Sequence, residues 1–321
     1  MAIYLSHNSA YHFWLSANER KVSMLHHALH HTLSDAEHTK RAVVSAGMHA
    51  TDQPDGPIHL LSSGERSKEV GGVFRHAWRG TIPSRAFVRV SPEVYVSTPE
   101  FCLLQLAGKL SVLELVIAGT RLMSCFRMEG PTLERRAPLC SRSSLRRVLD
   151  EVGSSYGCRK LQKALRWMSE NAASPIEEDG AVLFALPQRY GGYDLGPFSV
   201  NHRIPTNGID QLLLDRPDRS FFSVDFYWSQ RMLGLEYYGR WHGEGRQARK
   251  DQLRLNALKT LGHKVLVCEY SDLSKADECA VLVSQIREIL GKEVDCAQEE
   301  EALLPRRELR TMLFGTNPFS V

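Results

Sequence analysis

Alternating apolar and polar residues predict two consecutive β-strands in the segment FFSVDFYWSQRMLGLEYYG. Val224 and Phe226 are expected on one face of the first strand, because strand side chains alternate with a period of two. Asp225 and Tyr227 are expected on the opposite face. Glu236 in the second strand has the same kind of apolar neighbours. The pattern therefore predicts a hairpin in which each strand carries one acidic residue.

The two acidic residues are predicted to lie side by side. A two-residue loop at Gln230 and Arg231 places Asp225 opposite Glu236. Like charges directly opposite each other destabilise a half-buried sheet, because their Cβ atoms are only about 5 Å apart. A divalent cation or a shared proton removes this repulsion, and oxygen ligands on rigid strands suit Mg²⁺-assisted phosphodiester hydrolysis. The alternative is a hairpin whose acids reach water at the strand ends.

A basic helix is predicted after the second strand. Residues 247–261 place apolar side chains at helical spacing, and Gly262 is positioned to end the helix. The cations on and before this helix are Arg240, Arg246, Arg249, Lys250 and Arg254. A cationic helix beside an acidic pocket suits a nucleic-acid backbone. The alternative is a solvated face, which is the commoner meaning of a charge run.

These motifs occur in an order typical of a nuclease family. The strings VDFYW, LEYYGRWH and DQLRLNALKTLGHKVL resemble the very-short-patch-repair (Vsr) endonuclease-like branch of the PD-(D/E)XK nuclease superfamily. The last string supplies the helix signature Asp251, Arg254 and Asn256. The resemblance covers roughly residues 172–290. It implies an α/β fold, with a mixed sheet flanked by helices, and a metal-dependent DNA endonuclease.

The resemblance also implies a role for each matching residue. Asp225 and Glu236 would bind Mg²⁺ or Mn²⁺, and Glu177, in the string SPIE, would bind the metal through water or position the nucleophile. His242 would assist proton transfer, whereas by itself it is equally an ordinary polar residue at a strand end. Arg254 and the neighbouring cations would hold phosphate.

Tyr238 departs from the family pattern. The superfamily has a lysine at this position, and the Vsr-like branch often has an aspartate. Tyrosine neither replaces a carboxylate as a Mg²⁺ ligand nor carries a positive charge near neutral pH. The alternative expectation is therefore a catalytically degenerate nucleic-acid-binding regulator of antitoxin type.

The first half of the chain predicts a smaller α+β domain. A helix is expected at residues 5–16, strands at 58–61, 74–78, 87–91 and 94–96, and a further helix from Thr98. With the strings LSHNSA and VYVSTPEFCLLQLA, this order is similar to the middle region of abortive-infection AbiEi-type antitoxins. The resemblance covers about residues 1–125. It implies DNA binding and a link to phage defence or toxin–antitoxin systems, but it carries no catalytic motif.

Four histidines near the start are spaced as on adjacent faces of a helix. They are His26, His27, His30 and His31. No acid or cysteine completes a metal-ligand set with them, so the alternative is a polar helical segment.

The predicted domain organisation has four parts. A first domain at residues 1–128 is closed by Gly130 and Pro131, and a basic helical connector follows at 129–171. The nuclease-like domain is expected at 172–294 and a mobile tail at 295–321. The connector's cations either extend a DNA track or form a solvated face. Near Glu177, the acids Glu178 and Asp179 suit a helix start whatever their function.

Composition bounds these expectations. The 321 residues are 43% hydrophobic and 24% charged, as in soluble globular proteins. The formal charge of +3 means that any nucleic-acid affinity comes from a local patch. Seven cysteines without a CxxC pair favour a reducing cytoplasm and argue against a cysteine-zinc site. With no secretory signal or long apolar run, a cytoplasmic protein without a membrane partner is expected.

Overall fold

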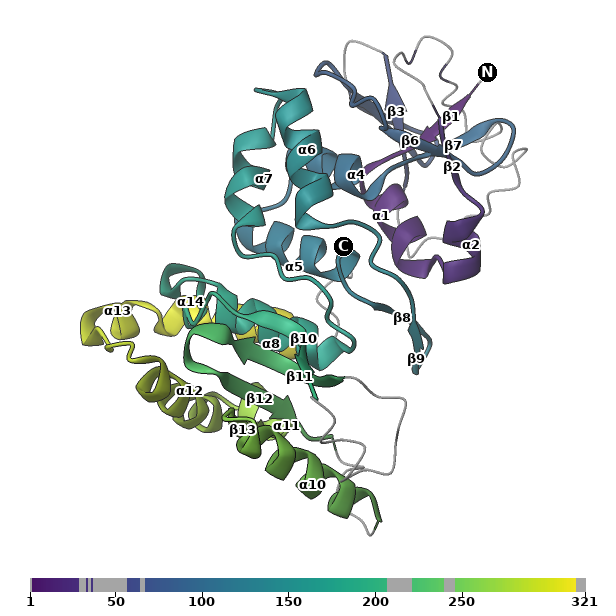
Figure 1. Ribbon diagram of the computed structural model, residues 1–321. Helices are drawn as coiled ribbons and strands as arrows, with labels where there is room; N and C mark the ends of the chain where they lie inside the picture. Colours follow the sequence, from purple (N-terminus) through teal and green to yellow (C-terminus); the bar gives the residue numbers. More distant parts are fainter. Residues whose placement is uncertain are drawn as a thin grey trace. The chain divides into compact units, whose positions relative to one another are not determined.

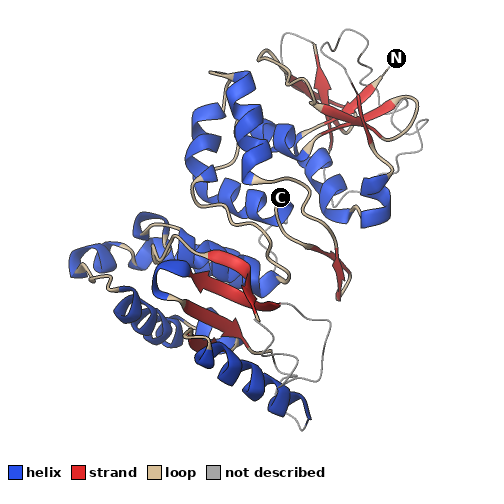
Figure 2. Cartoon of the chain, viewed as in Figure 1, coloured by secondary structure: helices blue, strands red, loops and turns tan. Residues whose placement is uncertain are grey.

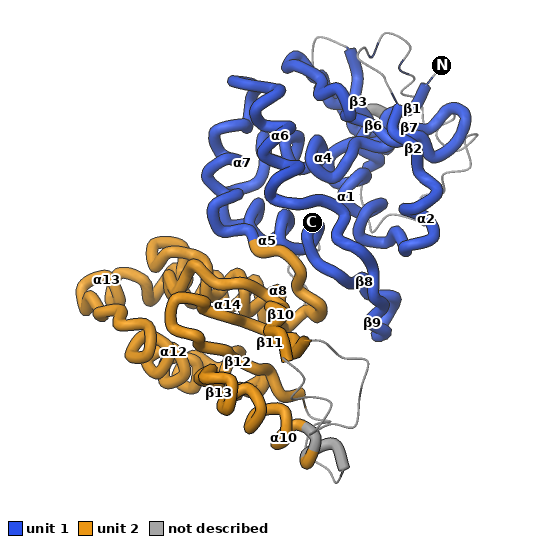
Figure 3. The backbone as a smooth tube through the Cα atoms, viewed as in Figure 1, with its two compact units in different colours: residues 1–168, 319–321 blue, residues 169–318 orange. Residues whose placement is uncertain are grey.

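The chain folds into two compact units. The computed structural model describes residues 2–28, 33, 36, 57–63, 67–206, 221–239 and 246–315. Unit 1 covers residues 1–168 and unit 2 covers residues 169–318 (Figure 3). The boundary lies close to the predicted start of the nuclease-like domain at 172, and residues 129–168 of the expected connector belong to unit 1. In the described ranges, no helix is long and apolar enough to cross a membrane.

Unit 1 is built around a mixed sheet, which has seven strands among the described residues (Figures 1 and 2). They are β1 Ile3–Leu5, β2 His26–Ala28, β3 Ile58–Ser62, β4 Lys68–Val70, β5 Val73–Ala77, β6 Phe87–Arg89 and β7 Val94–Ser97. Their order across the sheet is β2-β6-β7-β1-β3-β5-β4, with β1 parallel to β7 and antiparallel to β3. The strands predicted in this half of the chain are all present, with ends shifted by a residue or two.

The helices of unit 1 begin at recognisable sequence signals. They are α1 His7–Ser16, α2 Glu19–Ser23, α4 Pro99–Leu106, α5 Val112–Leu122, α6 Arg142–Val152 and α7 Cys158–Leu165. Ser111 and Ser141 begin α5 and α6 through capping boxes. Gly130, with a φ of 57°, turns a hairpin of β8 Phe126–Glu129 and β9 Thr132–Arg135. This glycine therefore lies inside unit 1 and does not close a domain.

Unit 2 is a second α/β unit around a sheet of order β10-β11-β12-β13. Its elements are α8 Pro175–Ala185, η2 Gln188–Tyr190, β10 Ser199–Pro205, β11 Phe221–Trp228, η3 Ser229–Arg231, β12 Leu233–Tyr237, α10 Arg246–Thr260, β13 Lys264–Cys268, α11 Tyr270–Ser274 and α12 Ala276–Leu290. The first three strands are antiparallel, and β13 runs parallel to β12 after the crossover helix α10. The mixed sheet with flanking helices confirms the predicted α/β class (Figure 2).

The hairpin of β11 and β12 has the predicted register but a different loop. Trp228 pairs with Leu233, and Phe226 pairs with Leu235. The loop is not a two-residue turn, because η3 forms a short 3-10 turn and Met232 takes a φ of 49°. The longer loop leaves the register unchanged, so Asp225 and Glu236 still approach each other from neighbouring strands.

The strict alternation predicted for β11 is wrong at Asp225. Val224 and Tyr227 share a buried cluster with residues of α10. Phe226 instead packs its ring 5.3 Å from that of Phe184 in α8. Val224 and Phe226 therefore face different helices on opposite sides of the sheet, although a regular strand would put them on the same side.

The neighbouring strand β10 is distorted at the same level. Its ladder to β11 pairs Val200 with Phe226 and His202 with Val224. Asn201, between these pairs, has a φ of 50°, which lies in the left-handed region. This local change of backbone direction accompanies the slip in side-chain alternation at Asp225.

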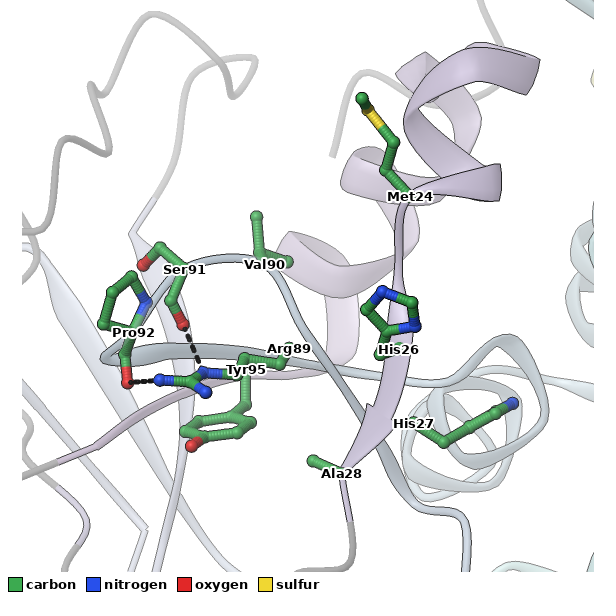
Figure 4. A pocket seen from close by; sticks show the side chains of 9 residues that line it. All are labelled: Met24, His26, His27, Ala28, Arg89, Val90, Ser91, Pro92 and Tyr95. Atoms are coloured by element: carbon green, nitrogen blue, oxygen red, sulfur yellow. Dashed lines mark hydrogen bonds between the residues drawn. The ribbon is translucent and has the colours of Figure 1, made fainter.

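The histidine segment is not the predicted helix. His26 and His27 lie on β2, an exposed strand paired with β6, and His30 and His31 lie outside the described residues. His26 lines a pocket of about 590 Å³. The side chains that line it are drawn in Figure 4. The guanidinium of Arg89 at this cavity donates to backbone carbonyls of the adjoining turn.

The predicted C-terminal tail is helical over most of its length. Residues 296–314 form α13 Cys296–Glu301 and α14 Leu303–Phe314. Leu309 and Leu313 are buried at helical spacing, and the Arg310 guanidinium donates to the Leu273 carbonyl. The predicted mobile tail is therefore wrong for this segment, which packs into unit 2.

Candidate functional site

Two acidic side chains occupy the centre of the unit 2 sheet. Glu236 on β12 is 3% exposed, and Asp225 on β11 is half-buried. The backbone N–H of Tyr237 donates to Asp225 Oδ2 at 2.8 Å. This bond ties the two strands together just beyond the last ladder pair, so it fixes the Asp225 carboxylate next to β12.

Arg254 on α10 forms a two-pronged ion pair with Glu236. Its Nη1 donates to Oε2 and its Nη2 donates to Oε1, each at 2.8 Å. Nη2 also donates to the carbonyl of Ser223. Bidentate pairs of this kind are the strong, orientation-specific form of a charge-assisted hydrogen bond. The guanidinium therefore supplies the positive charge that faces the buried carboxylate.

Burial and charge act in opposite directions on Glu236. The pKa of its carboxyl is raised to about 7, with burial as the largest cause; Arg254 lowers this pKa, and the carboxylates of Asp225 and Asp251 contribute to raising it. Asp225 accepts a hydrogen bond from the backbone of Tyr237, the residue after Glu236, so the two acids lie on neighbouring strands where they can share a cation or a proton.

Asp251 and Tyr238 belong to the same cluster. Asp251 lies on α10 one turn before Arg254 and is 9% exposed. The pKa of Tyr238 is raised by burial first, and then by the charges of Asp251 and Glu236. The sequence analysis identified Asp251 as part of a helix signature but did not predict that it belongs to this cluster. The i, i+3 spacing of Asp251 and Arg254 is the signal that both side chains share one face.

Glu177 is engaged at the start of α8. Its carboxylate accepts hydrogen bonds from the Ala173 backbone N–H at 2.8 Å, from Ser174 Oγ at 2.7 Å and from Asn201 Nδ2. Asn201 in turn accepts a hydrogen bond from Ser223 Oγ on β11. These contacts are those of a helix-capping residue, and a chain of hydrogen bonds joins it to the strand of Asp225.

A metal ion fits this site only with some rearrangement. In the ranges that the structure describes, no group of three or more His, Cys, Asp or Glu side chains is arranged to hold a metal ion. Asp225 and Glu236 nevertheless offer the hard oxygen donors that Mg²⁺ prefers. Because Arg254 donates one hydrogen bond to each oxygen of Glu236, a cation would bind through the remaining lone pairs of these oxygens or displace one of the two hydrogen bonds.

The predicted phosphate-binding residues are only partly described. Arg249 is exposed on α10, and Arg246 and Lys250 are part of the same helix. Arg240 and His242 lie outside the described residues. Of the two predicted cations whose side chains are described, Arg249 and Arg254, Arg254 is the one that contacts Glu236.

Unit 1 contains an imidazole cluster, made of His7, His59 and His76. His59 Nδ1 and His76 Nε2 share a hydrogen bond of 2.7 Å, and the rings of His7 and His76 stack with centroids 3.5 Å apart. The pKa of His59 is lowered to about 4 and that of His76 to about 3, mainly by burial and in part by the charge of Lys109. Burial also lowers the pKa of His7, which has a φ of 47°. All three imidazoles are therefore neutral at pH 7.

Comparison of the chain with known families, proteins and structures identified no related protein. The chain matches no protein-family model, no curated protein and no solved structure.

Proposed function

We propose that unit 2 is a Mg²⁺- or Mn²⁺-dependent endonuclease domain that hydrolyses phosphodiester bonds of DNA in the cytoplasm. The observation that carries this proposal is the coupled pair of Asp225 and Glu236 on neighbouring strands, with Arg254 as the cation beside it. Placing a buried and a half-buried acid side by side costs folding free energy, which Arg254 offsets at Glu236. Two carboxylates held together on rigid strands are the arrangement expected where a divalent cation binds.

Each residue has a separate task in this proposal. Asp225 and Glu236 would hold the divalent cation, which supplies an activated water and stabilises the charge that develops on the phosphate. Arg254, once released from Glu236, would hold a phosphate oxygen through its planar pair of N–H donors. Glu177 would position the nucleophile through its hydrogen bond to Asn201, and His242 would assist proton transfer.

Metal titration tests the proposal. Mg²⁺ and Mn²⁺ are titrated by calorimetry into the wild-type chain, into Asp225→Asn and into Asp277→Asn, which removes an exposed acid on α12. The same samples are then incubated with supercoiled plasmid. We expect the wild type and Asp277→Asn to bind metal and nick plasmid, and Asp225→Asn to do neither. Cleavage by Asp225→Asn that remains metal-dependent would refute the assignment.

A second candidate function is a nucleic-acid-binding regulator without catalytic activity. Two observations favour it: the ion pair of Arg254 already neutralises Glu236, and Tyr238 replaces the expected lysine or aspartate. This function predicts salt-sensitive DNA binding that a chelator does not change, with no plasmid nicking. A chain that binds no DNA at low salt would exclude it.

A further inference from the structure

Helix α7 in unit 1 carries a row of cations along one side. The row consists of Arg159, Lys163 and Arg166 and is called the α7 stripe here. Their i, i+4 and i+7 spacing places them on one helix face, and all three are exposed. Leu161 and Leu165 on the opposite face are buried, where α7 packs on α5 and α6 (Figure 1).

Arg159, at the start of the α7 stripe, is electrostatically unfavourable for the helix, whereas Lys163 and the C-cap residue Arg166 lie at the C-terminal end, where positive charge is favourable. The sequence of α7, CRKLQKAL, contains no acid. Arg159 and Lys160 lie in the first turn, where positive charge opposes the helix dipole. Arg159 and Lys163 repel each other as like charges at i, i+4. In the described part of the chain, neither Arg159 nor Arg166 forms an ion pair. A face that serves solubility alone usually mixes both signs, so this one requires another explanation.

Positive charge is also concentrated around the α7 stripe. Residues 142–166 contain seven Arg or Lys residues and two acids, which gives a net charge of +5, whereas the whole chain has +3. The remainder of the chain is therefore net negative. Because non-specific attraction by total charge is weak here, affinity for a polyanion depends on local patches of this kind.

We propose that the α7 stripe is the surface by which unit 1 holds the phosphate backbone of duplex DNA. The identity of this ligand rests on the proposed function of unit 2. At 1.5 Å per residue, Arg159 and Arg166 are about 10 Å apart along the helix. Duplex DNA carries one phosphate charge for about every 1.7 Å of its axis, so the stripe spans several phosphates.

The composition of the exposed face favours nucleic acid over a lipid surface. Binding to a membrane surface requires apolar side chains beside the cations. The outward face of α7 consists of Arg159, Gln162, Lys163 and Arg166. Such a face binds phosphates by charge and hydrogen bonding and carries no base-specific information. Its contribution to binding is therefore expected to be independent of DNA sequence.

The test measures the salt dependence of DNA binding by the full chain. A fluorescein-labelled duplex is titrated in the presence of a chelator, and fluorescence anisotropy gives the affinity between about 50 and 200 mM salt. The triple variant Arg159→Gln, Lys163→Gln, Arg166→Gln is compared with a control, Arg20→Gln, Lys68→Gln, Arg85→Gln, which removes equal charge from exposed positions elsewhere in unit 1. Three phosphate contacts predict that the slope of log affinity against log salt becomes shallower by about 2.7 in the stripe variant. The control keeps the wild-type slope.

The outcomes separate this inference from the proposed function. If the stripe variant keeps the wild-type slope, the inference is overturned while the nuclease proposal stands. If the stripe variant loses affinity but the wild type never nicks plasmid, the nuclease proposal fails alone. A wild type that does not bind duplex at low salt refutes both. Gln162→Glu, which adds one negative charge to the stripe and removes no cation, is expected to weaken binding as well.

Thermal unfolding checks that the stripe variant folds. Because its substitutions remove the repulsion between Arg159 and Lys163 but also two cations that favour the C-terminal end of the helix, its unfolding temperature is expected to stay within a few degrees of that of the wild type. A folded variant with an unchanged slope then counts fully against the inference.

Discussion

At the scale of single residues, several groups and the effect of burial act on the carboxylate of Glu236 at the same time. Arg254 holds both oxygens, burial favours the protonated form, and Asp225 and Asp251 add negative charge nearby. A divalent cation, a proton and a guanidinium therefore compete for the lone pairs of this carboxylate. The local pKa of about 7 puts this exchange within the physiological pH range.

This competition predicts that metal affinity depends on pH. Below pH 7 a proton has to leave Glu236 before the cation binds, so affinity is expected to fall by up to tenfold per pH unit. Above pH 7 the carboxylate is already ionised, and affinity levels off. Calorimetric Mg²⁺ titrations measure the affinity at several pH values between about 5.5 and 8.5, a window that extends about 1.5 units to each side of the pKa. Repeating them in two buffers of different ionisation enthalpy gives the number of protons released when the metal binds.

A variant without the titratable carboxyl at position 236 provides the control. Glu236→Gln cannot release this proton, so the weak metal binding that Asp225 retains should lose the pH dependence in this window. An affinity for the wild type that is constant across the window would contradict the assignment of Glu236 as a metal ligand.

At the scale of elements, β11 contributes side chains to two separate hydrophobic cores, because the alternation of its side chains between the two faces of the sheet is interrupted at Asp225. The left-handed conformation of Asn201 on β10 lies opposite the slip. Its side chain also donates to the Asn171 carbonyl at 2.9 Å and to Glu177. Asparagine tolerates a positive φ better than other side chains with a Cβ, so this residue suits both the backbone and the hydrogen bonds.

Substitution of Asn201 separates these two contributions. Asn201→Gly and Asn201→Ala both lose the side-chain hydrogen bonds, but only alanine adds strain at positive φ. We expect Asn201→Ala to be less stable than Asn201→Gly by about 1 kcal/mol in chemical denaturation. At Ser199, an exposed strand position, the order should reverse. The same order at both sites would contradict the role of the left-handed backbone.

The sequence predicts elements better than it predicts where their alternation breaks. The period of two located β11 and β12 together with their register, and Gly262, with a φ of 88°, follows α10 as expected. The interruption at Asp225 could not be predicted from the β11 sequence, because it accompanies the left-handed backbone of Asn201, which lies in the neighbouring strand β10. Likewise, His7, His59 and His76 are far apart in the sequence, and only the pairing of β1, β3 and β5 brings them together.

At the scale of the whole molecule, the imidazole cluster of unit 1 and Glu236 of unit 2 change stability with pH in opposite senses. In unit 1, the folded-state pKa values of His59 and His76 are lowered, so the unfolded chain binds more protons. Unit 1 therefore loses stability as pH falls from about 6.5 towards 4. In unit 2, the pKa of Glu236 is raised above its unfolded value, so this contribution is present at low pH and is lost as pH rises from 4.5 to about 7.

Calorimetric unfolding of the full chain tests this divergence. Between pH 7 and pH 5, the transition of unit 1 should move to lower temperature, and that of unit 2 should rise relative to it, because Glu236 stabilises unit 2 as pH falls while the lowered pKa of His263 offsets part of this gain. Each proton contributes about 1.4 kcal/mol per pH unit, which corresponds to a few degrees in a unit of this size. Hydrogen exchange of β3 and β11 amides assigns the transitions. His76→Gln and Glu236→Gln should each reduce the pH response of their own unit, and parallel shifts of both transitions would contradict the assignment.

The slip at Asp225 also sets a rule for how this sequence can vary during evolution. A Cβ on Gly180 would lie 2.9 Å from the Phe226 ring, and a Cβ on Gly234 would lie 2.8 Å from Val224. A larger residue at 180 therefore requires a smaller one at 226, and a larger residue at 234 requires a smaller one at 224. These two exchanges involve opposite faces of the sheet. Positions 224 and 226 of β11 should therefore covary with different partners, position 224 with 234 and position 226 with 180, as two independent pairs in related sequences.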